Sequence, residues 1–168
     1  MSIYFGVPIL LFAAVLQSTW LEDIRLLGGR PDLVLLFTIT WAIIRGANDG
    51  ALWGFIGGMF CDLLSGGVFG LWTLSLTAIG FLAGQPWVHA LGPTVIRLAL
   101  MSAIGTLFGH TILLAMMGLL GYAVDFARSI QTIAGPAALL NFILSPFAFT
   151  FLVWFHQRSE PRIGGFGE

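Results

Sequence analysis

Lysine is absent from this sequence, and charge of either sign is scarce. Charged residues make up 9% of the 168 residues, whereas an ordinary soluble domain carries about 25%. The seven basic residues, all arginine, and eight acidic residues give a formal net charge of −1, and no basic run occurs. The sequence therefore lacks the electrostatic footprint of a protein that binds nucleic acid or adheres to an anionic membrane surface.

Cysteine is nearly absent as well. The single cysteine, Cys61, excludes an internal disulfide, and we interpret it as a small packing residue. No group of His, Cys, Asp or Glu residues has the spacing of a metal site, so no metal or other cofactor is expected. One class of intramembrane protease needs a Gly-x-Ser-Gly nucleophile and another needs two membrane aspartates, and the sequence has neither pattern. It therefore predicts a protein that is not an enzyme.

Apolar residues, in contrast, are abundant. Hydrophobic residues make up 58% of the sequence, and the mean hydropathy is +0.96. A soluble fold could not bury this much apolar surface, so the composition predicts an all-α, multi-pass membrane protein. The first 20 residues lack the positive region and the cleavage site of a signal peptide, and we expect them to remain as the first membrane-spanning helix.

Six apolar segments predict a single membrane domain over residues 1–168, folded as a six-helix transmembrane bundle. The predicted spans are residues 3–21, 32–45, 50–64, 68–84, 95–122 and 133–155, and we expect residues 156–168 to form a disordered tail. A helix over residues 50–64 would be only about 22 Å long against a bilayer core of about 30 Å. We therefore expect this segment to be buried among its neighbours.

The arginines indicate the orientation only weakly. Six crossings place both termini on one side of the membrane. If that side is the cytoplasm, four of the seven basic residues lie in cytoplasmic segments: Arg45, Arg97, Arg158 and Arg162. The positive-inside rule therefore favours cytoplasmic N- and C-termini.

The stretch from Arg45 to Leu71 combines a polar turn, many glycines and one acidic residue. Residues 45–50 predict a tight turn, so the second and third segments should form an antiparallel hairpin. At 100° per residue, the small residues of the third segment share one helix face: Gly50, Gly54, Gly57, Gly58 and Cys61. Because glycines at such spacings let two helix backbones approach closely in a bilayer, we expect a partner helix on this face.

Asp62 has two interpretations that stay open. A carboxylate at membrane depth is a candidate for proton transfer or ion binding. The turn at residues 65–67 favours instead a structural role, in which Asp62 lies near an interface, caps the following helix or hydrogen-bonds a neighbouring helix. His110 has no carboxylate three or four residues away, so we expect a buried, hydrogen-bonding histidine. Asn141 is expected to hydrogen-bond a neighbouring helix.

Several short motifs follow one another in order through the first half of the chain. They are Gln17-Ser18-Thr19, Arg30-Pro31-Asp32-Leu33, Gly50 to Gly54-Phe55, Gly57 to Leu63, Gly66 to Gly70-Leu71, Gly80-Phe81 and Gly84. This series resembles the MreD family of rod shape-determining proteins, and the second half of the chain matches in hydropathy and length. Pro31 and Asp32 also suit the first turn of the second segment. The candidates for helix packing or partner interaction are Pro31, Asp32, Gly50, Gly54, Gly57, Gly58, Asp62, Gly66 and Gly70.

The resemblance implies a bundle similar to the substrate-binding subunits of energy-coupling-factor (ECF) transporters, located in the bacterial inner membrane. It also implies a non-enzymatic role in the cell-elongation machinery, which organises peptidoglycan synthesis in rod-shaped cells. The implied direct partner is the bitopic protein MreC, and through it MreB, RodA and a class B penicillin-binding protein. Membrane lipid is the other expected partner.

Three functions are open on the sequence. The first, which we predict, is a scaffold that binds partner helices. The second is a vitamin-type, small-molecule-binding subunit of a membrane transporter, in which Asn141, His110 and Asp62 would line a cavity. The third is an intramembrane hydrolase, for which the required motifs are missing.

Overall fold

The computed structural model describes the backbone of residues 3–20 and 28–159, and the regular elements in these two ranges are helices. The long helices are α1 (Ile3–Thr19), α2 (Leu33–Arg45), α3 (Ala47–Ser65), α4 (Leu71–Ala83), α5 (Thr94–Leu119) and α7 (Gly135–Ser159). Three short elements join them: a 3-10 helix, η1 (Pro86–Leu91), then α6 (Phe126–Ser129) and the π-helical turn η2 (Ile130–Ala134). α6, η2 and α7 follow one another without a break.

The long helices lie where the six apolar segments were predicted, and the short elements were not predicted. Within residues 3–20 and 28–159, two stretches are long and apolar enough to cross a bilayer, Thr94–Leu119 and Phe126–Trp154, and shorter apolar helices cover Gly6–Thr19, Leu33–Arg45 and Leu71–Ala83. The helical bundle is therefore confirmed, while the number of membrane crossings stays a prediction. α7 continues to Ser159, so residues 156–159 are helical rather than a disordered tail. Residues 160–168 of that tail and residues 21–27 of the first connection lie outside the described residues.

α2 is the central helix of the bundle. Every residue from Val34 to Ile43 is buried, and α1, α3, α4, α5 and α7 all pack against it. A helix that is apolar on all sides is stable only when protein or lipid surrounds it. α2 has 13 residues and is about 20 Å long, which is shorter than the bilayer core of about 30 Å. The five surrounding helices therefore provide the apolar environment of α2.

The connection between α2 and α3 is a single residue, Gly46, with φ +98°. The prediction of a turn over residues 45–50 is therefore wrong, because Ala47, Asn48 and Asp49 already form the first turn of α3. Arg45 Nε donates to Asp49 Oδ2 at 3.2 Å across this turn. α3 consequently has 19 residues, or about 28 Å, and is longer than the predicted segment over residues 50–64, while its ability to cross a bilayer alone stays a prediction.

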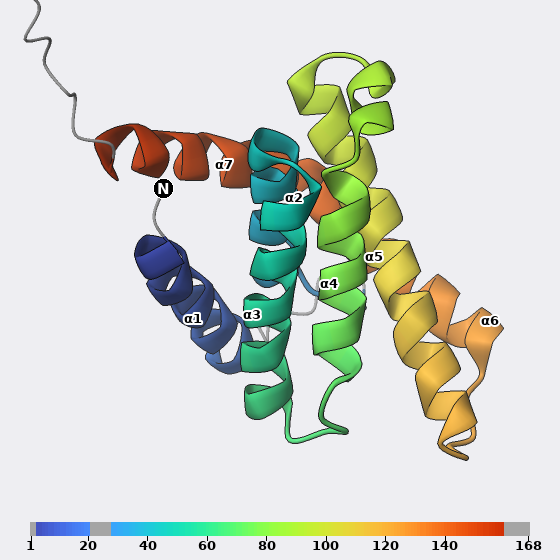
Figure 1. The fold of residues 1–168 in the computed structure, drawn as a ribbon. Coiled ribbons are helices and arrows are strands. Elements are labelled where there is room, and N and C mark those ends of the chain that lie inside the picture. Colours follow the sequence, from blue (N-terminus) through green and yellow to red (C-terminus); the bar gives the residue numbers. More distant parts are fainter. Residues whose placement is uncertain (1–2, 21–27, 160–168) are drawn as a thin grey trace, which may run out of the picture.

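The small-residue face of α3 packs directly on α4. A Cβ atom on Gly54 would lie 2.1 Å from the carbonyl oxygen of Leu76, and one on Gly58 would lie 2.4 Å from Thr73 Cα. Gly50 and Gly80 are mutually close, since a Cβ on Gly80 would lie 2.1 Å from the Gly50 carbonyl oxygen. The two backbones are thus in contact along the hairpin, which Figure 1 shows as two helices side by side.

Gly57 points in another direction, toward α2. A Cβ there would lie 2.6 Å from Val34 Cγ1 and 3.4 Å from Leu10 Cδ2 of α1. Close by, the rings of Trp41 of α2 and Trp53 of α3 stack with centroids 4.6 Å apart. The partner helices of the predicted glycine face are therefore α4 and α2 of the same chain.

α7 accommodates a proline within its length. Pro146 has no N–H, so the carbonyl of Phe142 lacks its usual helical partner. The buried hydroxyl of Ser145 donates to that carbonyl at 2.9 Å. This bond satisfies the freed backbone group inside the protein, as an apolar environment requires. Figure 1 shows α7 running across the bundle behind α2, with its end on the same side of the view as the start of α1.

Replacing Gly54 by alanine should destabilise the bundle, because the new methyl group would overlap the α4 backbone. We expect the free energy of unfolding to fall by about 1–3 kcal/mol, the usual range for overpacking. Gly118→Ala in α5 is the matched control, since the nearest atom to its Cβ, Phe126 Cε2, is 4.0 Å away. Thermal unfolding of both variants in detergent measures the difference, and equal midpoints would contradict backbone contact between α3 and α4.

Candidate functional site

Asp62 lies near the end of α3 and holds the beginning of α4. Its side chain is 3% exposed. Oδ1 accepts from the N–H of Trp72 at 3.0 Å, and Oδ2 accepts from the N–H groups of Gly70 at 2.9 Å and Thr73 at 3.0 Å. Oδ2 also accepts from Thr73 Oγ1 at 2.6 Å. The carboxylate therefore caps the N-terminus of a neighbouring helix, where a negative charge also complements the helix dipole.

The loop between the two helices makes this cap necessary. Gly66 ends α3 in the left-handed region with φ +63°, and Gly70 stands at the N-cap position of α4 with φ +100°. Glycine takes such φ values without strain, but it has no side chain with which to cap a helix. The Asp62 side chain supplies the missing acceptor across the hairpin.

The capping role predicted for Asp62 is confirmed by these bonds. Proton transfer or ion binding would need a lone pair that faces a substrate, whereas Oδ2 already accepts three hydrogen bonds. Among the described residues no group of three or more His, Cys, Asp or Glu side chains could hold a metal ion. The hydrogen bonds around Asp62 thus support a capping role.

Asp32 forms a second buried cap, at the start of α2. Its Oδ1 accepts from Leu35 N at 2.9 Å, so Asp32 is the N-cap residue and the buried Pro31 precedes the helix. The prediction that Asp32 lies at the positive end of the helix dipole is therefore confirmed, whereas the first-turn position predicted for Pro31 is wrong because the helix begins at Leu33. The loop before them lies against α7, since a Cβ on Gly29 would lie 2.3 Å from Ala137 N.

Asn141 of α7 connects this cap to α5. Its Oδ1 accepts from the backbone N–H of Asp32 at 2.9 Å, and its Nδ2 donates to Thr106 Oγ1 at 2.9 Å. The Asn141 side chain is fully buried. The expectation that Asn141 hydrogen-bonds a neighbouring helix is confirmed, and both of its partners were missed because they lie far from it in sequence.

His110 belongs to the same region of α5. Its Nδ1 donates to the carbonyl of Thr106, 2.9 Å away, which is a bond within its own helix. The predicted hydrogen-bonding histidine is confirmed and is partly rather than fully buried. Asp62 has its hydrogen-bond partners in the α3–α4 hairpin, whereas Asn141 has its partners on α2 and α5. The three polar side chains proposed for a ligand cavity therefore do not form one hydrogen-bonded group.

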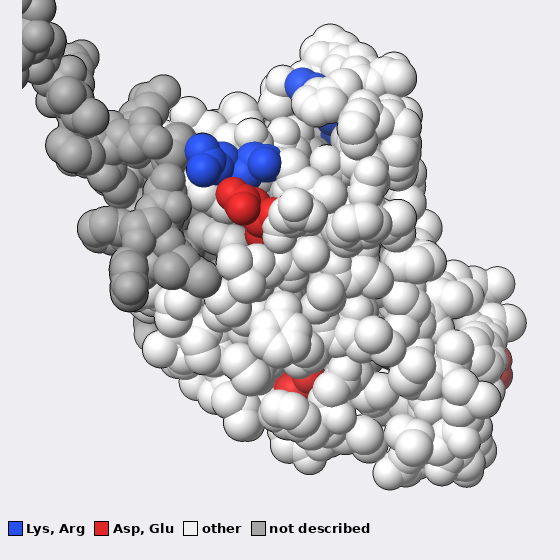
Figure 2. Space-filling model, viewed as in Figure 1, with Lys and Arg blue, Asp and Glu red and all other residues white. Residues whose placement is uncertain are grey.

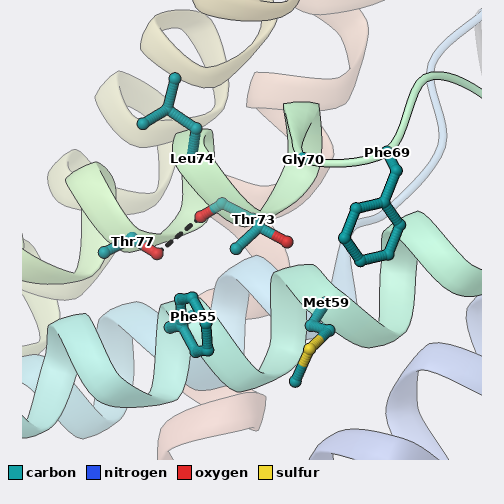
Figure 3. Close-up of a pocket in the computed structure, with 7 residues that line it drawn as sticks. All are labelled: Phe55, Met59, Phe69, Gly70, Thr73, Leu74 and Thr77. Atoms are coloured by element: carbon teal, nitrogen blue, oxygen red, sulfur yellow. Dashed lines mark hydrogen bonds between the residues drawn. The ribbon is translucent and has the colours of Figure 1, made fainter.

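A shallow groove of about 290 Å³ runs over the outer side of the α3–α4 hairpin, next to the Asp62 cap. We call it the hairpin groove. Its lining residues are Phe55, Met59, Phe69, Gly70, Thr73, Leu74 and Thr77. Figure 3 shows the rings of Phe55 and Phe69 and the Met59 side chain along α3 and the loop, opposite the threonines of α4. The Thr77 hydroxyl donates to the Thr73 carbonyl at 2.6 Å and Thr73 Oγ1 donates to Asp62, so the groove presents mainly carbon to its surroundings.

The hairpin groove was not predicted from the sequence. Phe55 and Met59 follow the four-residue spacing of a helix face opposite the glycines, and this spacing is the signal that could have identified them. Figure 2 shows the blue atoms in the upper part of the viewed face and red atoms beside them, in the lower middle and at the right edge, while uncharged residues cover the rest of the described surface. An uncharged, apolar outer surface suits contact with lipid tails or with another membrane helix.

Asp62→Leu should destabilise the protein more than Asp62→Asn. Leucine leaves the N–H groups of Gly70, Trp72 and Thr73 without their acceptor, and each unpaired buried donor costs about 1–3 kcal/mol. Asparagine keeps one oxygen and loses fewer bonds. Thermal unfolding in detergent should rank the proteins wild type, Asp62→Asn, Asp62→Leu.

The matched control for these variants is Asp49→Asn, which removes an exposed ion pair and should change stability by less than about 1 kcal/mol. Cell shape in a strain that depends on the variant protein provides a second measurement. If Asp62→Asn keeps wild-type stability and yet fails to support rod shape, the carboxylate has a chemical role and the capping interpretation is wrong.

Asn141→Ala and Thr106→Val should show coupled effects on stability, because their side chains share one buried hydrogen bond. We expect a coupling free energy of about 0.5–3 kcal/mol in a double-mutant cycle. Unfolding of the two single variants and the double variant in detergent measures it. Strictly additive effects would show that the bond between α5 and α7 contributes no stability.

Comparison with known protein families identifies the family of this chain. It matches the model of the family "rod shape-determining protein MreD" over residues 2–158, which is nearly the whole chain. The protein therefore belongs to the MreD family, membrane proteins with a role in rod shape determination, and the resemblance found in the first half is confirmed and extends through the second. No curated protein and no solved structure gives a match.

Proposed function

We propose that this member of the MreD family is a non-enzymatic scaffold in the bacterial inner membrane, which binds the bitopic protein MreC. Through MreC it would associate with MreB, RodA and a class B penicillin-binding protein and so help to organise peptidoglycan synthesis. Membership of a family with a role in rod shape determination supports the process. The contact with MreC is our inference.

The hairpin groove is the observation that carries this proposal. A single membrane-spanning helix binds through shape and close packing, because lipid tails are as apolar as its own side chains. The groove offers a concave apolar surface beside α3, between the bulky side chains Phe55 and Leu74, both of which are exposed. A helix with small or branched side chains fits such a surface.

The buried polar groups of the bundle also support a scaffold. Asp62 caps α4, Asp32 caps α2, and Asn141 bridges α2 and α5. None of the three side chains lines the hairpin groove or the second groove of about 280 Å³ between α5 and α7, which is lined by apolar residues. A vitamin-binding subunit needs convergent polar groups in one pocket, so this alternative has less support.

The proposed orientation places both termini in the cytoplasm. In that orientation, the Gly46 turn and η1 face the cytoplasm, and the loop from Gly66 to Gly70 faces the periplasm. The hairpin groove then lies toward the periplasmic end of the bundle, because Phe69 and Gly70 at its rim belong to this loop.

The double substitution Phe55→Ala, Leu74→Ala should weaken co-purification with MreC by about tenfold or more, as loss of central anchor residues does. The glycines of α3 are unsuitable for this test, because a bulky residue at Gly54 or Gly58 would overlap α4. Pull-down of tagged MreC from detergent-solubilised membranes measures binding, and unfolding midpoints show whether the variant remains folded.

Phe147→Ala on α7 is the control, since this side chain is exposed and lies outside the hairpin groove. It should leave the amount of co-purified MreC unchanged. If the double variant retains wild-type binding while folded, the groove is not the MreC surface. If a vitamin instead stabilises the purified protein at nanomolar concentration, the scaffold proposal gives way to the transporter-subunit alternative.

A further inference from the structure

The beginning of α5 carries a cation without a counter-ion in the described part of the chain. Arg97 lies one turn into α5, where its guanidinium contacts His89 Nδ1 of η1 and donates to Thr94 Oγ1 at 2.7 Å. Neither of these two partners carries a negative charge. Arg45, in contrast, pairs with the carboxylate of Asp49. The contacts of Arg97 therefore orient its charge without neutralising it.

Part of this guanidinium is withdrawn from solvent. Its Nε atom is buried and has no hydrogen-bond partner among the described atoms. An unpaired charge that is partly removed from water is costly, and the cost falls when an anion pairs with it. His89 and Thr94 hold the planar guanidinium group of Arg97 in one orientation, which reduces the entropy lost when a ligand binds.

The first turn of α5 adds donors next to the guanidinium. Pro93 occupies the N-cap position and offers no side-chain acceptor, so the first backbone N–H groups of this 26-residue helix have no side-chain cap. Helix N-termini attract anions through these N–H groups and through the helix dipole. The space beside Gly92 is open, since no atom lies within 4 Å of a Cβ built there.

Exposed apolar side chains surround this group of donors. Trp87 of η1 is 53% exposed, and Val95 and Ile96 beside Arg97 are 52% and 50% exposed. Tryptophan is enriched at the boundary between lipid headgroups and hydrocarbon. In Figure 2 the blue atoms at the top of the view, over the segment between α4 and α5, have no red atoms beside them.

We propose that Arg97, His89 and the first turn of α5 bind a phosphate-bearing anion, namely the headgroup of an anionic phospholipid. Arg97 would pair with the phosphate oxygens through its free N–H groups, and Trp87, Val95 and Ile96 would contact the acyl chains. A free phosphate ion would share the polar contacts but would leave these apolar side chains without a partner. The lack of a basic run in the sequence argues against broad adhesion to an anionic surface, whereas one headgroup needs only one well-placed cation.

The test uses the full-length protein in nanodiscs of phosphatidylcholine alone, of phosphatidylcholine with phosphatidylglycerol, and of phosphatidylcholine with added inorganic phosphate. The unfolding midpoint and the lipids retained in native mass spectrometry are measured for each. We expect phosphatidylglycerol to raise the midpoint and to be retained in preference to phosphatidylcholine. Equal midpoints and equal retention of the two lipids by the wild-type protein would overturn the proposal without use of any variant.

Arg97→Gln should lower the affinity for phosphatidylglycerol by about tenfold, since charge-assisted hydrogen bonds are lost. The matched control is Arg45→Gln, which removes an arginine already paired with Asp49 and should keep the wild-type response. If Arg97→Gln responds to phosphatidylglycerol as the wild type does, the site is wrong. If inorganic phosphate alone gives the full, Arg97-dependent effect, the lipid assignment is overturned in favour of a free phosphate anion.

Discussion

Backbone contact between α3 and α4 is the constraint on which the other features of this bundle depend. Glycines on both helices remove the side chains that would otherwise separate them, and Gly54 and Gly80 illustrate this on either side. Because the helices lie so close, the short side chain of Asp62 reaches three backbone N–H groups at the start of α4. The glycine face and the buried acid are therefore parts of one arrangement, in which close approach makes the cap possible.

The free N–H groups at the start of α2 also need acceptors, and residues from several helices provide them. Asp32 caps its own helix, Gln17 Oε1 of α1 accepts from Val34 N at 3.3 Å, and Asn141 of α7 accepts from the Asp32 N–H. In an apolar environment water cannot satisfy the free N–H groups of a helix end, so side chains must do so. As a result, the N-terminus of the short central helix lies inside the protein, where it is hydrogen-bonded to residues of α1 and α7.

The sequence predicted the features that repeat along one helix and missed those that join distant segments. The glycine face of α3 and the capping role of Asp62 follow from spacing and from the turn chemistry just after Asp62. The helix that covers the glycine face could not be predicted, because a face that suits close packing suits a helix of this chain and a helix of another chain equally well. The bond from Asp32 to Asn141 spans 109 residues, and no local pattern indicates such a pair. The length of α3 was underestimated because Asn48 and Asp49 resemble turn residues, although Asp49 also fits the first turn of a helix.

The residues of the bundle fall into two groups: buried residues that hold the helices together, and exposed residues on its outer surface. Residues that look functional in the sequence because they are polar and deep, such as Asp62 and Asn141, are engaged in holding helix ends and helix pairs. We expect a change at such a residue to alter the fold first, so that any loss of partner binding that follows would be indirect. The outward-facing side chains Phe55 and Leu74 contribute little to the packing of the helices because both are exposed. The proposed partner and lipid surfaces therefore lie on the outer side of the bundle, apart from the glycine contacts and the buried caps, and they combine exposed apolar side chains with the polar group around Arg97 at the start of α5.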